Sequence, residues 1–198
     1  MKNTCLILAS SSPRRIQMLK EQGYQFKIVK PLCSEVNCLK KGARLSALNN
    51  STAKALCASK KNNDCVILSA DTVVVLKDQI LGKPKNKKDA LKMLSALNNK
   101  THSVLTAYTI LVKQDNRTKI MLETVVESKV VFGDFNKEDY SEYINSGEPM
   151  DKAGAYAIQG LGARFVKEVR GSYSNVVGLP LFEVMNSLKK AGVKPSWK

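Results

Sequence analysis

Apolar blocks separated by polar stretches with helix-starting signals predict a chain in which strands and helices alternate. An apolar run at 5–9 has the length of a buried strand, and Ser12 and Pro13 then begin a helix whose apolar spacing runs to Gly23. Further strands are predicted at 26–29, 65–76, 80–81, 101–113, 119–132 and 164–169. Further helices are predicted at 42–59, from 180 to 190, and after the N-cap residues Asn86 and Asn136.

The two longest alternating segments, 101–113 and 119–132, flank a polar turn and predict a β-hairpin. Because helices and hairpins are interspersed along the chain, the pattern predicts an α/β protein with a mixed sheet. We find no internal repeat, low-complexity linker or clear boundary, so residues 1–198 are predicted to form a single domain.

Composition narrows the class of protein. The chain is 43% hydrophobic and 25% charged, which is typical of a soluble globular protein, and no apolar run approaches the roughly 18 residues of a membrane helix. We expect no signal peptide and no membrane partner. The five cysteines form no Cys-x-x-Cys pair and there is one histidine, which argues against zinc and a disulfide framework and predicts a reducing, cytoplasmic location.

The formal net charge of +15 favours a polyanionic partner. Many lysines lie in short clusters without a regular basic stripe or interleaved aromatic residues, which favours solvated surfaces over a nucleic-acid groove. A nucleic-acid-binding module nevertheless stays an alternative to an enzyme.

The serine loop after the first strand is a candidate anion site. A strand that passes through Ser10, Ser11 and Ser12 into a helix points backbone N–H groups and the positive end of the helix dipole at one place. Arg14 and Arg15 lie in the first helical turn, where their charge does not stabilise the helix, so the pair suggests triphosphate binding. The alternative is a solvated helix start in a lysine- and arginine-rich protein.

Asp71 is a candidate catalytic carboxylate because it lies inside the apolar run at 65–76. A buried carboxylate is costly unless a cation or hydrogen bonds satisfy it, so Asp71 is predicted to be a general base or a ligand of a divalent metal such as Mg²⁺. The alternative is an aspartate that caps a turn at a strand end.

Two polar residues are weaker candidates. Lys83 follows a turn and precedes Pro84, from where it could reach the same site as a phosphate ligand. Gln159 ends the glycine-rich segment 147–160, whose composition is typical of a binding loop built onto a strand, and its amide suits the edge of a base. The alternative for Gln159 is a polar residue that closes a strand.

Six segments in order resemble the Maf family of nucleoside triphosphate pyrophosphatases. They are Ala9 to Arg15, Ser69 to Val74, Leu81 to Pro84, His102 to Ala107, Asp151 to Gly160, and Gly171 to Tyr173 through Val177 to Pro180. The resemblance implies hydrolysis of a nucleoside triphosphate to the monophosphate and pyrophosphate, with Mg²⁺ or Mn²⁺ as cofactor. It also implies an elongated mixed sheet flanked by helices, with two lobes around a central cleft, as in the inosine triphosphatase group.

The resemblance also implies roles for individual residues. Ser10, Arg14 and Arg15 match the family's phosphate loop, to which the predicted helix cap Ser12 belongs, and Asp71 matches its proton acceptor. Glu35 falls where the family has an acidic residue that helps to hold metal. Lys54, Lys83 and Gln159 match further functional positions, although Asn49, Asn50 and Ser51 replace the Arg-Leu-Ala that usually precedes the helical lysine.

Within the family, Arg14, Thr72 and Gln159 match the members that act on dTTP and UTP, so the expected role is nucleotide-pool sanitation, with modified pyrimidines as further candidate substrates. The alternatives are a member that acts on 7-methyl-GTP or another triphosphate, and a nucleotide-binding regulator of cell division, since bacterial relatives are tied to septum formation. Several members are dimers, which makes a homodimer one expected form.

Overall fold

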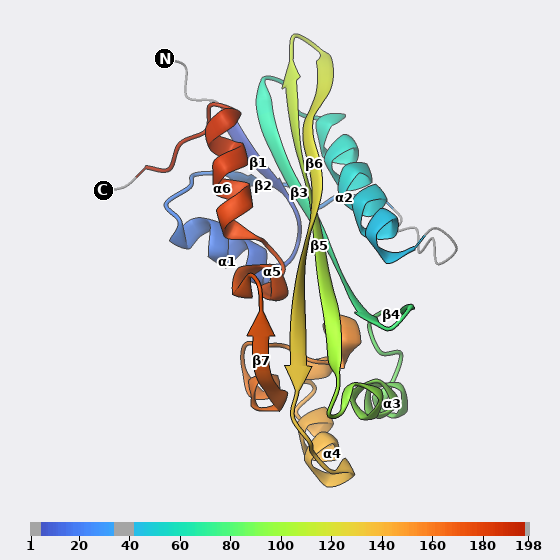
Figure 1. Cartoon of the computed structure of the whole chain (residues 1–198). Coiled ribbons are helices and arrows are strands. Elements are labelled where there is room, and N and C mark those ends of the chain that lie inside the picture. Colours follow the sequence, from blue (N-terminus) through green and yellow to red (C-terminus); the bar gives the residue numbers. More distant parts are fainter. Residues whose placement is uncertain (1–4, 34–41, 197–198) are drawn as a thin grey trace. The chain divides into compact units, whose positions relative to one another are not determined.

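The computed structural model describes residues 5–33 and 42–196, in which seven strands form one mixed sheet (Figure 1). The strands are β1 (Cys5–Ala9), β2 (Lys27–Ile28), β3 (Cys65–Leu76), β4 (Gln79–Leu81), β5 (Thr101–Gln114), β6 (Arg117–Phe132) and β7 (Val166–Arg170). The helices are α1 (Pro13–Glu21), α2 (Ala43–Ser59), α3 (Lys87–Leu97), α4 (Lys137–Asn145), α5 (Tyr173–Val177) and α6 (Leu181–Lys190). Three short 3₁₀ helices are η2 (Glu148–Asp151), η3 (Ala153–Ala155) and η4 (Leu161–Phe165).

The strand order β2-β1-β3-β5-β6-β7 combines parallel and antiparallel pairs, with β4 paired to β3. β1 is parallel to both β2 and β3, whereas β4 and β7 run antiparallel to β3 and β6. The predicted α/β class with a mixed sheet is therefore confirmed.

The chain folds into two compact units. The first comprises the described parts of Met1–Asp71, Thr106–Val126 and Gly178–Lys198, and the second comprises Thr72–Leu105 and Glu127–Val177. Two units are consistent with the two lobes that the resemblance implies, and the assignment of residues 1–198 to one domain stays a prediction.

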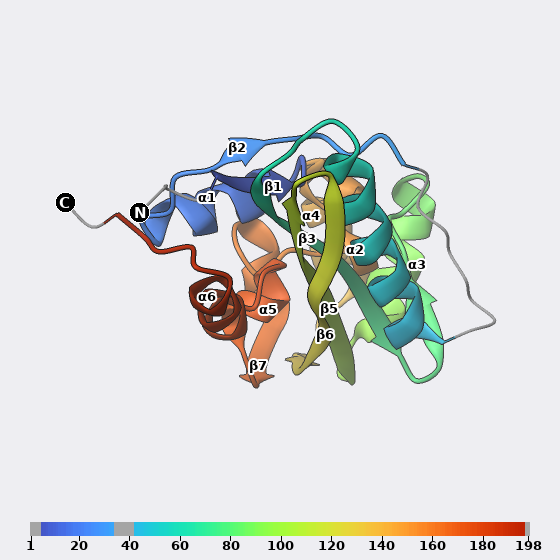
Figure 2. The same ribbon diagram turned by 90° about the horizontal axis from the view of Figure 1, so that it is seen from above.

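In the first unit, α2 and α6 cover opposite faces of the sheet (Figure 2). The Oγ1 of Thr109 on β5 lies 2.9 Å from the Oγ of Ser51 on α2, and the hydroxyl of the next residue back, Tyr108, lies 2.9 Å from the Oγ of Ser187 on α6. Because successive side chains of a strand point to opposite faces, these two contacts place one helix on each face. The apolar core under α2 contains Ile7, Ala9, Ala55, Ala58, Cys65, Ile67 and Leu111.

In the second unit, α3 and α4 pack on an aromatic core. Phe165 lies near the centre, with Tyr140 and Tyr143 of α4 at centroid distances of 5.0 and 5.2 Å. Apolar residues of α3 complete this core, and they recur every three or four positions as the helical pattern predicts: Ala90, Leu94 and Leu97.

Two of the three predicted helix caps are confirmed in full. The side chains of Asn86 and Asn136 accept hydrogen bonds of 2.9 Å from the backbone N–H groups of Asp89 and Asp139. Ser12 occupies the N-cap position of α1, but its side chain makes no capping hydrogen bond. The capping expectation for Ser12 is therefore correct in position and wrong in mechanism.

The glycine-rich segment differs from the prediction of a loop built onto a strand. It forms the short turns η2 and η3, because Gly147, Gly154 and Gly160 have φ of +79°, +71° and +83°, which a strand cannot accommodate. The following strand begins at Val166 rather than 164 because η4 occupies the residues before it, and the short helix α5 was not anticipated. None of the described helices is long and apolar enough to cross a membrane.

His102 lies in the core of the second unit and not at a candidate site. Its Nε2 is 2.7 Å from the hydroxyl of Tyr156, and its ring meets that of Phe132 edge-on at a centroid distance of 5.1 Å. Burial lowers the pKa of His102 from 6.5 to about 4. This environment gives the single histidine a structural role.

We therefore expect the stability of the protein to fall as the pH drops from about 6.5 towards 4. In that range the unfolded chain binds a proton on His102 that the folded chain does not bind, which costs about 3 kcal/mol when complete. Urea unfolding between pH 7 and 4.5 measures this loss against the variant His102→Gln, which lacks the titration. Equal pH dependence in both proteins would contradict the assignment.

Candidate active site

The loop between β1 and α1 is organised by its own serines. The buried Ser10 accepts a hydrogen bond of 3.2 Å on its Oγ from the backbone N–H of Ser12, and the helix begins with the bond from the N–H of Ile16 to the carbonyl of Ser12. The first turn contains no acidic residue. The loop therefore presents a helix N-terminus with two arginines and no local negative charge.

The two arginines of this turn have different environments. The Nε of Arg15 donates a hydrogen bond of 2.8 Å to the carbonyl of Gly178, which fastens α1 to the chain just before α6. Arg14 is half-buried, and its side chain forms no hydrogen bond or ion pair with the part of the chain that the structure describes. Arg14 is therefore the better candidate for binding an external anion, and Arg15 has at least a structural role.

The register of the sheet brings Asp71 close to the serine loop. Ala9 at the end of β1 pairs with Ser69 of the parallel strand β3. Ser10 follows Ala9 directly, and Asp71 is two residues after Ser69 on β3. Two residues span about 7 Å along a strand, so Asp71 lies near the start of the serine loop. The first unit therefore unites the serine loop and the candidate carboxylate.

Two side chains of α2 bind the Asp71 carboxylate. The Nζ of Lys54 lies 2.6 Å from its Oδ1, and the Nδ2 of Asn50 donates to its Oδ2 at 3.2 Å. The Lys54 and Asp71 side chains are only 10% and 11% exposed, so this is a buried ion pair. Residues four apart on a helix share a face, which explains why both reach one carboxylate.

A buried hydroxyl cluster holds α2 in the register that this geometry needs. The Oγ of Ser51 lies 2.9 Å from Thr109 Oγ1 and 3.3 Å from Ser69 Oγ, and Ser69 donates to the Ser51 carbonyl at 2.7 Å. These three residues are fully buried, so the bonds are made without competition from solvent.

The remaining predicted residues lie in the second unit. Thr72 is half-buried, whereas Lys83 and Gln159 are exposed and their side chains form no hydrogen bond among residues 5–33 and 42–196. The backbone N–H of Gly154 donates to the carbonyl of Gly82 at 3.0 Å, which ties the turn that carries Lys83 to the segment that leads to Gln159. The roles assigned to Thr72, Lys83 and Gln159 stay predictions.

Asp71 is the described carboxylate that the sequence assigns to metal binding. Glu35, the other predicted ligand, lies outside the described residues, and within the described ranges no group of three or more His, Cys, Asp or Glu could hold a metal ion. Each carboxylate oxygen of Asp71 has two acceptor positions, of which one is used by Lys54 or Asn50. The second position on each oxygen is the one that a hard cation could use, and a metal at Asp71 stays a prediction.

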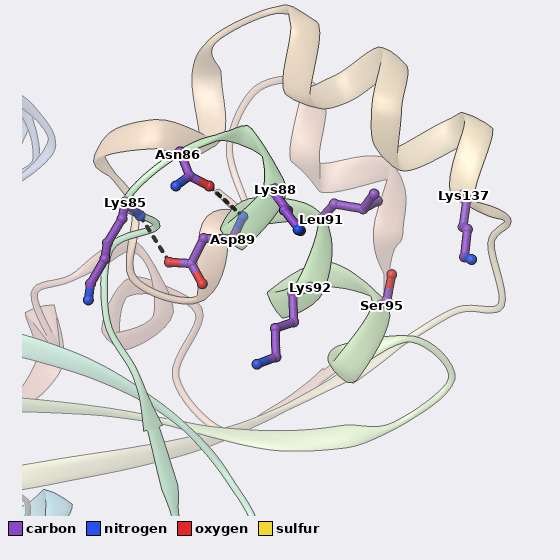
Figure 3. Close-up of a pocket in the computed structure, with 8 residues that line it drawn as sticks. All are labelled: Lys85, Asn86, Lys88, Asp89, Leu91, Lys92, Ser95 and Lys137. Carbon is purple, nitrogen blue, oxygen red and sulfur yellow. Dashed lines mark hydrogen bonds between the residues drawn. The ribbon is translucent and has the colours of Figure 1, made fainter.

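A lysine-lined pocket of about 510 Å³ lies elsewhere, at the start of α3 (Figure 3). Its carboxylate, Asp89, accepts the backbone N–H of Lys85 at 2.9 Å and belongs to the helix cap with Asn86. None of the residues predicted for catalysis or substrate binding lines this pocket.

Comparisons with known proteins identify the family. The family described as Maf-like protein matches residues 5–191, and the chain belongs to the Maf family. A protein from Dictyoglomus thermophilum named dTTP/UTP pyrophosphatase is 40% identical over 188 residues, which cover 94% of this chain and 96% of that protein. A protein of the same name from Vibrio parahaemolyticus is 42% identical over 183 residues, which cover 92% and 94%.

Among solved structures, a HAM1 protein from Coxiella burnetii aligns over 94% of this chain and 99% of its own, with a TM-score of 0.48 and 14% sequence identity. This likeness is too distant to bear on function.

The sequence did not lead us to expect Asn50 as a hydrogen-bond donor to Asp71. Asn50 belongs to the triplet that departs from the family pattern, and an asparagine is a poor helix former at a buried position. Its spacing of four residues before Lys54 was the signal that could have identified it.

We expect Lys54→Met to destabilise the protein by about 3–5 kcal/mol, because the change removes the cation paired with a buried carboxylate while keeping the volume of the side chain. Urea unfolding measures the loss. The double variant Lys54→Met, Asp71→Leu should recover part of it, because no buried charge is left unpaired. A single variant as stable as the unaltered protein would show that the pair is not buried in solution.

Proposed function

We propose that the protein is a nucleoside triphosphate pyrophosphatase that hydrolyses dTTP and UTP to the monophosphate and pyrophosphate. The observation that carries the proposal is the buried Asp71 carboxylate, held by Lys54 and Asn50 on the strand that pairs with β1, which leads into the serine loop. The names of the relatives from Dictyoglomus thermophilum and Vibrio parahaemolyticus support the same reaction and substrates.

In this proposal water attacks the α-phosphorus and the bond from that atom to the bridging oxygen of the β-phosphate breaks. Asp71 accepts a proton from the attacking water, and the leaving pyrophosphate carries the electron pair of the broken bond. Arg14, with Arg15 and Lys83, offsets the negative charge that grows on the leaving group. Lys54 pairs with the Asp71 carboxylate and orients it.

A divalent metal belongs to the proposal as a cofactor. Asp71 would hold it, together with Glu35 if that residue has the role the resemblance implies. Mg²⁺ or Mn²⁺ bound there would supply positive charge to the phosphate oxygens.

Base selectivity is assigned in this proposal to the second unit. The Gln159 amide has an NH2 group that can donate to O4 and a carbonyl oxygen that can accept from N3–H, the edge that thymine and uracil share. Thr72 and Arg14 complete the set of residues that match pyrimidine-specific members. Such an enzyme would act in the cytoplasm on the nucleotide pool.

The direct test is pyrophosphate release from dTTP, UTP, CTP, GTP and 7-methyl-GTP, with Mg²⁺, with Mn²⁺ and with a chelator. We expect release from dTTP and UTP at least tenfold above the other nucleotides, and its loss with chelator. Preference for 7-methyl-GTP would overturn the substrate assignment, and full activity in chelator would overturn the metal requirement. No release from any nucleotide, with salt-dependent binding to nucleic acid, would favour the binding-module alternative.

We expect Asp71→Asn to lower kcat for dTTP by about 10²–10⁴-fold, because an amide neither accepts the proton nor supports a cation as a carboxylate does. Asp78→Asn, at an exposed turn between β3 and β4, is the matched control and should keep full activity. Circular dichroism establishes that both variants fold. Full turnover by folded Asp71→Asn would refute the role given to this carboxylate.

A further inference from the structure

The segment that carries Gln159 has little regular backbone bonding of its own. Gln159 lies between η3 and η4, in a stretch built from short 3₁₀ turns. Since its own side chain is exposed and forms no hydrogen bond within the described residues, its position depends on how the flanking backbone is held.

Glu148 holds the backbone on the C-terminal side of Gln159. Its Oε2 accepts the N–H of Leu161 at 3.0 Å, and its Oε1 accepts the N–H of Gly162 at 3.0 Å. Two backbone donors on one carboxylate make charge-assisted hydrogen bonds, which are stronger than those between neutral groups. The carboxylate therefore fixes the chain two and three residues after Gln159.

Tyr143 of α4 holds the N-terminal side of the same residue. Its hydroxyl donates to Glu148 Oε1 at 3.0 Å and accepts the N–H of Ala157 at 3.3 Å. Burial and the neighbouring Glu148 carboxylate raise the pKa of Tyr143, so the hydroxyl stays a donor at neutral pH. Both flanks of Gln159 are thus attached to one pair of side chains that rests on the aromatic core.

Two glycines allow the backbone to approach this pair. A Cβ on Gly160 would lie 2.6 Å from Glu148 Oε2, and one on Gly162 would lie 2.6 Å from the Tyr143 hydroxyl oxygen and from the carbonyl oxygen of Ala157. Gly160 also has φ of +83°, a conformation that side chains disfavour. The contact between loop and carboxylate therefore depends on the glycines at these two positions.

We propose that Glu148 and Tyr143 form a clamp that positions Gln159 to read the pyrimidine base, and that both are positioning residues for substrate selectivity. This inference rests on the proposed function, in which the Gln159 amide meets the base edge. An amide that distinguishes O4 from an amino group must be held in place, because a mobile amide can turn either its oxygen or its nitrogen to the base.

The helix α4 offers a matched pair of substitutions for the test. Tyr140 and Tyr143 are both buried against Phe165, and both hydroxyls donate a hydrogen bond, but Tyr140 donates to Asn98 at 2.6 Å, away from the clamp. Tyr143→Phe removes the clamp hydroxyl, whereas Tyr140→Phe removes a comparable hydroxyl outside it. Glu148→Gln is a second clamp variant of unchanged size.

The measured quantities are the ratio of kcat/KM for UTP to that for CTP, and the amide hydrogen exchange of Leu161 and Gly162. We expect Tyr143→Phe and Glu148→Gln to lower the ratio roughly tenfold, mainly through KM for UTP, and to speed exchange of both amides. Tyr140→Phe should change neither quantity.

Three outcomes would overturn the inference or its basis, and they can be told apart. Faster exchange with an unchanged ratio would show that the clamp does not set selectivity. Unchanged exchange in both clamp variants would show that the side chains do not hold the loop. Absence of hydrolysis by the unaltered protein would contradict the proposed function itself and, with it, the assignment of selectivity to the clamp.

Discussion

The placement of α2 on the sheet depends on the buried ion pair between Lys54 and Asp71. A carboxylate so little exposed, inside a strand of the sheet, is unfavourable unless a cation meets it. That cation comes from α2, so the helix must lie over β3 with one particular face inward. Buried hydroxyls of Ser51 and Thr109 complete the constraint, because their hydrogen bonds are satisfied only in the same register. The Lys54 ammonium group must reach the Asp71 carboxylate, and this requirement determines how α2 lies on the sheet.

In the second unit, the carboxylate of Glu148 is stabilised by a different kind of partner. The Glu148 carboxylate binds backbone N–H groups and a tyrosine hydroxyl rather than a lysine. The two backbone partners lie in the short turn η4, and the tyrosine belongs to α4. In the first unit, the Lys54 ammonium group orients Asp71, to which we assign catalysis. In the second unit, the Glu148 carboxylate binds the backbone next to Gln159, to which we assign recognition of the base.

The adjacent arginines of α1 show how one motif can contain two functions. Successive residues on a helix point in directions about 100° apart, so Arg14 and Arg15 have different surroundings. Arg15 bonds the carbonyl of Gly178, which fixes the start of α6 against α1. Arg14 has no such contact within the described chain, which leaves its charge for an anion at the helix N-terminus.

Local patterns determined much of this protein: the strand and helix order, the Asn86 and Asn136 caps, the hairpin and the family. The elements and caps follow from the sequence because apolar periodicity and capping act between residues close together in the chain, and the family follows from the resemblance of six segments. Only the tertiary structure decided the partners of Asp71, Arg15 and Glu148. Those contacts join residues 17, 163 and 14 positions apart, and the geometry of packing, rather than local preference, selects which distant polar group satisfies a buried charge.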